Sequence, residues 1–304
     1  MKKNIQILMS TYNGEKYIKE QLDSIILQKG NFDLKLLIRD DGSSDETIKI
    51  IKEYSEKIEM KVIEGENIGV NKSLEELFKK CDTGCDYFAI SDQDDVWLEG
   101  KLENAINKLN QMNSKFKLFA SRSFVTDENL NIFGKTQDSE GRNSFYNSMV
   151  QNICPGHTQV FSREIVLELQ KNYSRDIFII DWWIYLLASG IGEVFFYREC
   201  TVKHRQHRLN AAGYEVSFLK KINRRLKYLR KYKESPVSKQ IRAFYNIYKG
   251  KMKLEYEQEI ERFLGNQKNV FLRIKYILNC KTFRYGKIEN SIYKILYVFG
   301  KYKL

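Results

Sequence analysis

Residues 86–97 read DYFAISDQDDVW, an apolar run that passes directly into an acidic cluster. The run has the length and composition of a buried strand, and three aspartates follow within four positions. If the chain stayed extended, Asp92 and Asp94 would lie on the same side, where carboxylates repel unless a cation lies between them. We therefore favour a divalent-metal site with oxygen ligands. The alternative is an acidic turn in which Asp94 or Asp95 caps a helix beginning near Leu98.

Around this stretch the sequence alternates between short apolar runs and segments with helical spacing of apolar residues. Near-continuous apolar strands separated by helices predict an α/β fold with a mainly parallel sheet covered on both faces. The expected strands are 5–9, 34–38, 60–63, 86–90 and 117–121, and the expected helices are 15–28, 45–57, 70–80 and 98–112. Beyond residue 135 we expect a helix near 145–152, a strand near 157–161, a helix at 163–171, a helix containing Asp181 and a strand at 193–198.

Polar clusters follow three of the expected strands. They are residues 10–13, residues 40–43 and residues 91–95. Ligands of such sheets bind beyond the carboxyl ends of the strands, so these clusters are candidates for one shared site. Taken alone, the second cluster fits an ordinary turn and helix cap, and Tyr12 in the first could belong to the core. Three clusters at one edge are more than turns require.

Cysteines and apolar segments indicate where the protein works. The chain of 304 residues has five cysteines, and its first residues lack the apolar core of an export signal, so we expect a reducing cytoplasm. Cys81 and Cys85 are expected to be free thiols rather than metal ligands. The most apolar long segment, 177–197, contains Asp181 and Glu193, which favours a buried helix and strand over a membrane span.

The positive charge lies at the end of the chain. Residues 216–304 hold 23 Lys and Arg against 6 Glu, a net charge of +17, whereas the rest of the chain sums to −5. Residues 217–233 combine this charge with apolar residues at helical spacing, so a basic amphipathic helix is expected there. It could lie on an anionic membrane or pack on the preceding domain, and both readings stay open. Nucleic-acid binding is disfavoured because no corresponding motif is present.

Taken together, the motifs resemble those of another group of proteins in both order and spacing. The motifs are Ser10-Thr11-Tyr12-Asn13-Gly14-Glu15, Arg39-Asp40-Asp41-Gly42-Ser43-Ser44-Asp45, Asn67-Ile68-Gly69, residues 91–97, Asp181-Trp182-Trp183, and Arg205-Gln206-His207 through Asn210. Over about residues 4–213 the chain resembles the family 2 glycosyltransferases, which have the GT-A fold. The form of residues 91–97 is similar to the rhamnosyltransferase-like branch that builds bacterial surface polysaccharides.

The resemblance implies roles for particular residues. Asp181 would be the general base that deprotonates the acceptor hydroxyl, although a helix N-cap is its alternative. Asp94 and His207 would bind Mg²⁺ or Mn²⁺, and Trp97 and Trp182 offer flat faces to an acceptor sugar, whereas core packing is preferred for Trp183. The implied nucleotide-sugar contacts are Ser10, Thr11, Tyr12, Asn13, Glu15, Asp41, Asn71, Asp92 and Gln93.

The chain departs from the pattern of this branch at several positions. Pro155-Gly156-His157-Thr158 stands where the branch usually has Thr-Gly-Cys-Thr, so the acceptor side is expected to differ. His204 precedes His207 by three positions and could be the metal ligand instead, or a surface residue. Ser10 replaces the usual proline of the first motif.

These observations predict a GT-A catalytic domain over 1–213 and a basic helical region over 214–304. Within the first, 1–115 would bind the nucleotide sugar and 116–213 the acceptor. The expected activity is inverting sugar transfer, preferably of L-rhamnose from dTDP-rhamnose and otherwise of a hexose from a UDP-sugar. The acceptor would be a polyprenyl-linked or growing surface glycan, and the enzyme would be peripheral on the inner face of the cell membrane. The alternatives are a catalytically silent scaffold subunit and, less favoured, a nucleotidyltransferase.

Overall fold

The computed structural model describes residues 2–207 and 234–304, which form two compact units. The first unit comprises residues 2–141, 154–171 and 192–207, and the second comprises 142–153, 172–191 and 234–304. Two segments from before residue 213 thus belong to the same unit as the C-terminal helices, while the proposed domain boundary itself stays a prediction. Asn210 and the whole of the expected amphipathic helix at 217–233 lie outside the described residues.

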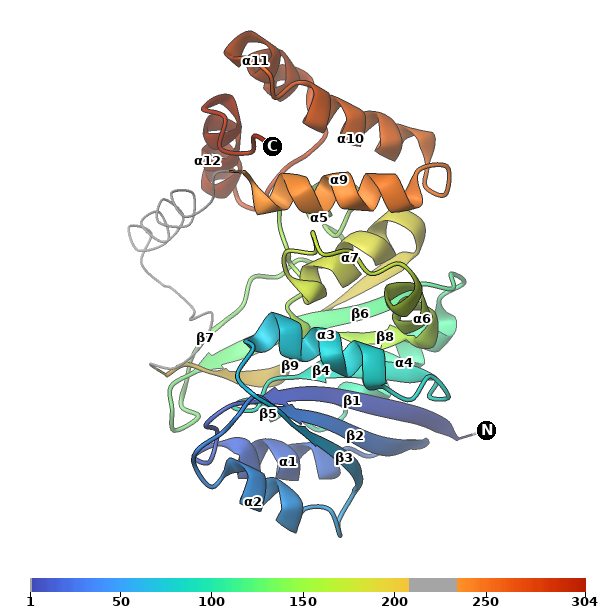
Figure 1. Cartoon of the computed structure of the whole chain (residues 1–304), viewed down its shortest axis with the longest axis vertical. Coiled ribbons are helices and arrows are strands. Elements are labelled where there is room, and N and C mark those ends of the chain that lie inside the picture. Colours follow the sequence, from blue (N-terminus) through green and yellow to red (C-terminus); the bar gives the residue numbers. More distant parts are fainter. Residues whose placement is uncertain (1, 208–233) are drawn as a thin grey trace. The chain divides into compact units, whose positions relative to one another are not determined.

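The first unit is built on a nine-stranded sheet with the order β3-β2-β1-β4-β8-β6-β9-β5, in which β7 also pairs with β6 (Figure 1). One half is the predicted parallel arrangement, with β1 (Lys3–Thr11), β2 (Phe32–Asp40), β3 (Glu59–Glu64) and β4 (Tyr87–Ser91). In the other half, β6 (Lys117–Thr126) and β9 (Glu193–Arg205) are parallel to each other. The antiparallel strands are β5 (Val96–Trp97), β7 (Ile132–Lys135) and β8 (Val160–Ser162). The α/β fold is therefore confirmed.

Helices cover both faces of this sheet, as the apolar strands predict. One face of β1 packs against α1 (Ile18–Ile26), α2 (Thr47–Glu53) and α4 (Lys101–Gln111) in a single core. The opposite face is covered by α3 (Val70–Lys80) and α6 (Arg163–Lys171), and there the ring of Phe78 stacks on Phe161 with centroids 6.0 Å apart. Figure 1 shows α1 and α2 on one side of β1–β3 and α3 on the other.

The carboxyl ends of β1, β2 and β4 lie side by side, because these strands are parallel neighbours. β1 ends at Thr11, β2 at Asp40 and β4 at Ser91. The three polar clusters therefore share one edge of the sheet, as predicted from the order of strands and helices.

Two elements near the acidic cluster begin later than predicted. The helix expected from Leu98 starts at Lys101, because Val96 and Trp97 instead form β5 against β9. Gly100 precedes that helix with a φ of 78°, a left-handed conformation that glycine adopts without strain. The strand expected at 157–161 starts at Val160, and the residues before it form a short 3₁₀ helix, η1 (Gly156–Thr158).

The strand expected at 193–198 continues to Arg205 as β9. Its pairing with β6 is interrupted by register shifts between Ser121 and Ser123, and it then resumes through residue 126. Only a short strand was predicted because the apolar run of the sequence ends at Tyr197. The longer β9 carries His204 to the acidic cluster, which the shorter predicted strand would not have reached.

The second unit is helical, with α5 (Phe145–Ser148), α7 (Ile180–Ile191), α9 (Pro236–Tyr248), α10 (Leu254–Gly265), α11 (Val270–Asn279) and α12 (Lys287–Val298). Trp183 of α7 is fully buried and packs against the rings of Phe244 and Tyr248 in α9. A Cβ at Gly190 would lie 2.8 Å from the Phe244 ring, so glycine permits this close packing. α7 is the buried helix predicted from the sequence. Within residues 2–207 and 234–304, no helix is both long and apolar enough to cross a membrane.

Candidate functional site

Hydrogen bonds join the loops that follow β1 and β2. Asp40 accepts a hydrogen bond from the Thr11 hydroxyl at 2.8 Å and another from the Ser43 backbone N–H at 2.7 Å. Asn13 has a left-handed φ of 45°, and its Oδ1 accepts the Ser44 backbone N–H at 2.9 Å. Asp40 therefore performs the turn chemistry that was the simpler interpretation of its cluster, and the two loops are held as one structure.

Gln93 of the acidic cluster holds the loop after β1. Its Oε1 accepts the Tyr12 backbone N–H at 2.9 Å, and its Nε2 donates to the Tyr12 carbonyl at 3.0 Å. A Cβ at Gly14 would lie 2.4 Å from the Gln93 Oε1, so glycine leaves the space that this amide occupies. The Tyr12 residue is 46% exposed while its backbone is fixed, which suits a surface that receives a flat ligand.

Asp41 forms hydrogen bonds with the loop that leads into α3. Its carboxylate accepts the backbone N–H of Ile68 at 2.9 Å and of Gly69 at 2.8 Å, and it is paired with the buried guanidinium of Arg39. The carboxylate is thus held in a fixed orientation at the edge of the sheet. Its predicted contact with a nucleotide base stays a prediction.

The other predicted nucleotide contacts lie on the same loops and helices. The Ser10 hydroxyl donates to the Ser73 hydroxyl of α3 at 2.8 Å. Glu15 accepts the backbone N–H of Glu46 at 3.0 Å, which links the first loop to the start of α2. Asn71 lies in the first turn of α3.

Asp94 and His207 are brought together from the acidic cluster and from just beyond β9. The Asp94 Oδ2 lies 2.7 Å from the His207 Nε2, and the His207 ring packs on Tyr17 with centroids 4.8 Å apart. Burial and the charge of Asp95 raise the pKa of the Asp94 carboxyl, while His207 acts in the opposite direction. An oxygen and a nitrogen donor this close could hold a divalent cation between them after a small separation.

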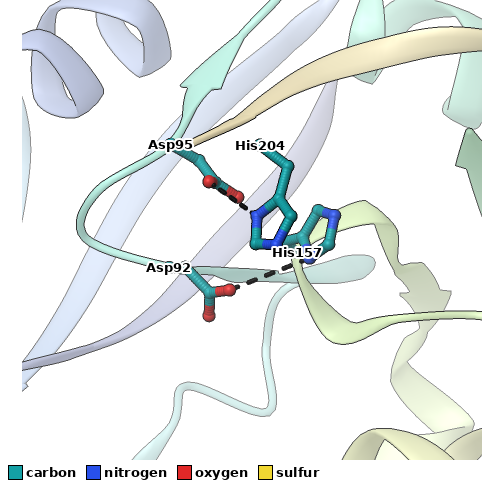
Figure 2. A group of neighbouring side chains, drawn as sticks. All are labelled: Asp92, Asp95, His157 and His204. Atoms are coloured by element: carbon teal, nitrogen blue, oxygen red, sulfur yellow. Dashed lines mark hydrogen bonds and ion pairs between the residues drawn. The ribbon is translucent and has the colours of Figure 1, made fainter. Parts of the chain in front are cut away.

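A second group converges beside this pair and contains Asp92, Asp95, His157 and His204 (Figure 2). One potential ligand atom from each lies within 4.8 Å of the others. The two imidazoles stack with centroids 4.4 Å apart and an interplanar angle of 8°. The His204 Nδ1 lies 3.0 Å from Asp95 Oδ1, and the His157 Nε2 lies 2.8 Å from the Ser123 hydroxyl.

The electrostatics of this group separate its two histidines. Burial opposes the charged form of His204, but the Asp95 carboxylate more than offsets it and raises the pKa of His204 to about 9. Burial, with the charge of His204, lowers the pKa of His157 to about 3. Lys101 is fully buried and donates to the His157 carbonyl at 3.1 Å, and burial lowers its pKa to about 7 despite Asp95. At neutral pH the group therefore contains one cationic and one neutral imidazole.

The arrangement of the aspartates corrects the expectation drawn from strand alternation. β4 ends at Ser91 and the chain bends at the next residues, so the two-residue alternation does not extend to Asp94. Asp92 lies with His157 and Asp95, whereas Asp94 lies with His207. Neither Asp94 nor Asp95 caps the following helix, because Gly100 occupies its N-cap.

The tryptophans contribute to the two cores. Trp97 is only 3% exposed and packs with α1 and α4, and the Lys101 Nζ lies 4.6 Å from its ring centroid. Trp182 is also buried, and its Nε1 donates to the Ser148 carbonyl at 2.6 Å. Both rings pack against protein neighbours, so only their small exposed edges could contact an acceptor. The predicted acceptor contacts of Trp97 and Trp182 stay a prediction.

Asp181 is the second residue of α7, in the second unit. It is partly buried and is followed by the two buried tryptophans. α7 begins at Ile180, so Asp181 lies inside the first turn, where a carboxylate is favoured by the helix dipole. The general-base role stays a prediction.

Sequence reasoning missed three members of the buried network: Asp95 as a partner of His204, Ser123 as a partner of His157, and Lys101 as a buried cation. His157 was noticed only as a departure from a pattern, whereas His204 was named as an alternative metal ligand or a surface residue. The available signal was the third aspartate of the acidic run, because a cap needs one carboxylate and this run supplies three.

Comparisons with known proteins agree with this architecture. The family model described as glycosyl transferase family 2 matches residues 6–170. The dTDP-rhamnosyl transferase RfbG of Shigella flexneri is 33% identical over 228 residues, which are 71% of this chain and 77% of that protein. The structure of S. aureus TarS 1–349 in complex with UDP-GlcNAc aligns with a TM-score of 0.57 at 17% identity, over 99% of this chain and 89% of that one. A mannosyltransferase from Pyrobaculum calidifontis, solved with GDP-Man and Mn²⁺, aligns with a TM-score of 0.54 at 13% identity, over 99% and 84%. Because the family model covers more than half of the chain and a relative above 30% identity covers more than two thirds of it, the protein is a glycosyltransferase and belongs to glycosyl transferase family 2.

Proposed function

We propose that this glycosyltransferase moves a sugar from a nucleoside diphosphate onto a hydroxyl of a glycan, with inversion at the anomeric carbon. The observation that carries the proposal is the joining of three polar loops at one sheet edge, with Tyr12 exposed and held by Gln93. Ligands of parallel sheets bind at such an edge. Aligned nucleotide-sugar enzymes support the fold of this edge, and the residue roles are our proposal.

The proposed metal is Mg²⁺ or Mn²⁺, held by Asp94 and His207. Their donor atoms are 2.7 Å apart, and both side chains are largely buried, so the chain supplies a fixed oxygen and nitrogen donor beside the acidic loop. When bound, the cation would offset the charge that develops on the departing diphosphate. Arg205 donates from its Nε to the Asp94 carbonyl at 2.9 Å and so holds the loop that carries this donor.

We propose dTDP-L-rhamnose as the donor, with a UDP-hexose as the second candidate. The similarity to the dTDP-rhamnosyl transferase supports the first, and the alignment with a UDP-GlcNAc complex supports the second only at the level of fold. In this proposal Asp181 removes the proton of the acceptor hydroxyl, which attacks the anomeric carbon while the nucleoside diphosphate leaves. The acceptor would be a polyprenyl-linked or growing surface glycan.

The proposal also places the enzyme peripherally on the inner face of the cell membrane. α11 exposes Phe271, Ile274 and Leu278, which are spaced so that they lie along one side of the helix. α12 and its C-cap expose a similar set: Ile288, Ile295 and Phe299. Lysines accompany both rows, namely Lys268, Lys275, Lys287 and Lys301. Apolar residues flanked by lysines suit the headgroup region of an anionic bilayer, where they add burial to attraction.

The proposed activity is tested by incubating the full chain with Mn²⁺ and a panel of nucleotide sugars and measuring release of the nucleoside diphosphate. We expect slow hydrolysis of one donor, with dTDP-L-rhamnose preferred over UDP-hexoses, and loss of it in Asp94→Asn. Hydrolysis of none of the donors, together with no nucleotide binding in calorimetry, would favour the scaffold alternative. Nucleotide binding with transfer only when an acceptor is added would retain the enzyme and identify its acceptor.

A further inference from the structure

The two stacked histidines are each oriented by a hydrogen bond on the nitrogen that faces away from Asp92. The His157 Nε2 is bonded to Ser123, and the His204 Nδ1 is bonded to Asp95. Figure 2 shows the remaining nitrogens, His157 Nδ1 and His204 Nε2, at the same end of the stack, toward the Asp92 carboxylate. Histidine ligands of metals are typically oriented in this way, with the second nitrogen bonded to a carboxylate or another polar group.

An independent observation concerns the charge of Asp95. This residue is fully buried, and its Oδ2 has no hydrogen-bond partner among the residues that the structure describes. An unsatisfied carboxylate oxygen in the interior is costly, and nearly all such groups have a partner. A cation bound next to His204 would lie close enough to Asp95 to offset this cost.

We infer that Asp92, His157 and His204 form a second divalent-cation site, with Asp95 and Ser123 orienting the two imidazoles. Asp94 and His207 are not part of this group, and the inference does not depend on the identity of the sugar donor. The site binds its cation without a nucleotide, because all of the ligands named come from the protein. The cation replaces the proton on His204 Nε2, which is released on binding.

The donor set identifies the class of cation. Two imidazole nitrogens and a carboxylate suit Mn²⁺, Fe²⁺ or Zn²⁺, whereas Mg²⁺ prefers oxygen ligands and retains several waters. The potential ligand atoms are up to 4.8 Å apart, while tetrahedral ligands about 2.1 Å from an ion are about 3.4 Å from one another. The ligand atoms must therefore move closer together to bind one ion. Asp92 Oδ2 lies 3.8 Å from His157 Nδ1, and the Asp92 side chain is 45% exposed.

The site is tested with Mn²⁺ alone added to the nucleotide-free full chain, in excess Mg²⁺, with free Mn²⁺ measured by electron paramagnetic resonance. Mn²⁺ is chosen because it binds thiolates more weakly than softer metals do, so the five free thiols compete little for it. We expect one bound Mn²⁺ per chain. Asp92→Asn and His204→Gln should each weaken it by at least about 10-fold, while Asp94→Asn and His207→Gln leave it unchanged.

A matched pair of serine variants separates a metal site from a buried polar network that only stabilises the fold. Ser123→Ala removes the partner of His157 and should weaken Mn²⁺ binding by about 10-fold. Ser121→Ala is the control, because this residue is equally buried on the same strand and its hydroxyl bonds Thr201 at 2.6 Å instead. Thermal unfolding of both variants shows whether they fold. Both substitutions change only a side chain of β6.

Three results would overturn the inference. They are no bound Mn²⁺ in the nucleotide-free chain, equal binding in wild type and Asp92→Asn, and equal weakening by the two serine variants. Binding that requires a nucleoside diphosphate and is lost in Asp94→Asn would also overturn it, yet would support the proposed function. Conversely, nucleotide-free binding in a chain that hydrolyses no donor would retain this site and reject the proposed function.

Discussion

Gln93 provides a direct test of whether the Tyr12 loop forms the nucleotide site. Gln93→Met keeps the length of the side chain but removes both hydrogen bonds to the Tyr12 backbone, at 2.9 and 3.0 Å. Gly14→Ala should break the same contacts by another route, because its Cβ would lie 2.4 Å from the Gln93 Oε1. Gly14 does not have a left-handed φ, so alanine adds no backbone strain there.

The expected magnitude follows from these two hydrogen bonds. Each contributes about 0.5–1.5 kcal/mol net, and water can replace part of this because both bonds lie at the surface. Loss of both should therefore cost about 1–2 kcal/mol of loop order, which corresponds to about 5- to 30-fold weaker binding of the nucleoside diphosphate. The two substitutions remove one interaction, so the double variant should bind about as weakly as either single variant.

The affinity for dTDP and UDP is measured by calorimetry on the wild type, Gln93→Met, Gly14→Ala and the double variant. Gln111→Met is the control, because Gln111 is an exposed glutamine at the end of α4. Thermal unfolding should change little in all of them, because the contacts are at the surface. Wild-type affinity in Gln93→Met would refute the reasoning that this amide orders the site. Additive losses in the double variant would show that Gly14 acts through something other than Gln93.

The remaining predictions concern the base, the membrane and a buried cation. Asp181→Asn is expected to keep nucleotide affinity but to lower transfer by at least about 100-fold, and near-normal turnover would reject the base role. Serine at both Phe271 and Leu278, which are 79% and 76% exposed, should reduce sedimentation with anionic liposomes at low salt without changing thermal unfolding; unchanged sedimentation would exclude α11. Burial lowers the pKa of Lys101 from 10.5 to about 7, so the unfolded chain binds more protons between these values and the wild type gains stability as the pH rises through them. Lys101→Met removes this dependence, so its stability relative to wild type in urea titrations should fall by about 3 kcal/mol from about pH 6 to about pH 9, and a pH-independent difference would contradict the shift.

The parallel half of the sheet and its polar edge could be predicted from the sequence because they depend on local patterns. Apolar runs separated by helical spacing define strands and helices, and parallel order then places Thr11, Asp40 and Ser91 at one edge. The family motifs lie on those same strands. Both predictions needed no information about contacts between distant segments.

The details of the acidic cluster could not be predicted, because they depend on partners more than 60 positions away in the chain. Strand alternation paired Asp92 with Asp94, but the chain bends after Ser91, and the partners are instead supplied by η1 and β9. His157 and His204 come together only because β8 and β9 each pair with β6. Periodicity within one segment contains no information on such a juxtaposition.

The length of β9 connects these observations to function. β5 pairs with β9 directly after the acidic cluster, and the Asp95 Oδ1 accepts the backbone N–H of Arg205 at 3.1 Å. The Arg205 side chain in turn donates to the Asp94 carbonyl and pairs with Glu20 of α1. The end of β9 thus fixes both ends of the Asp94–Asp95 segment, and it leads directly to His207. The geometry of the proposed metal ligands Asp94 and His207 is therefore set by β9 as much as by the strand that precedes the acidic motif. A change of register in β9 should consequently impair binding of the nucleotide sugar even with every motif residue intact.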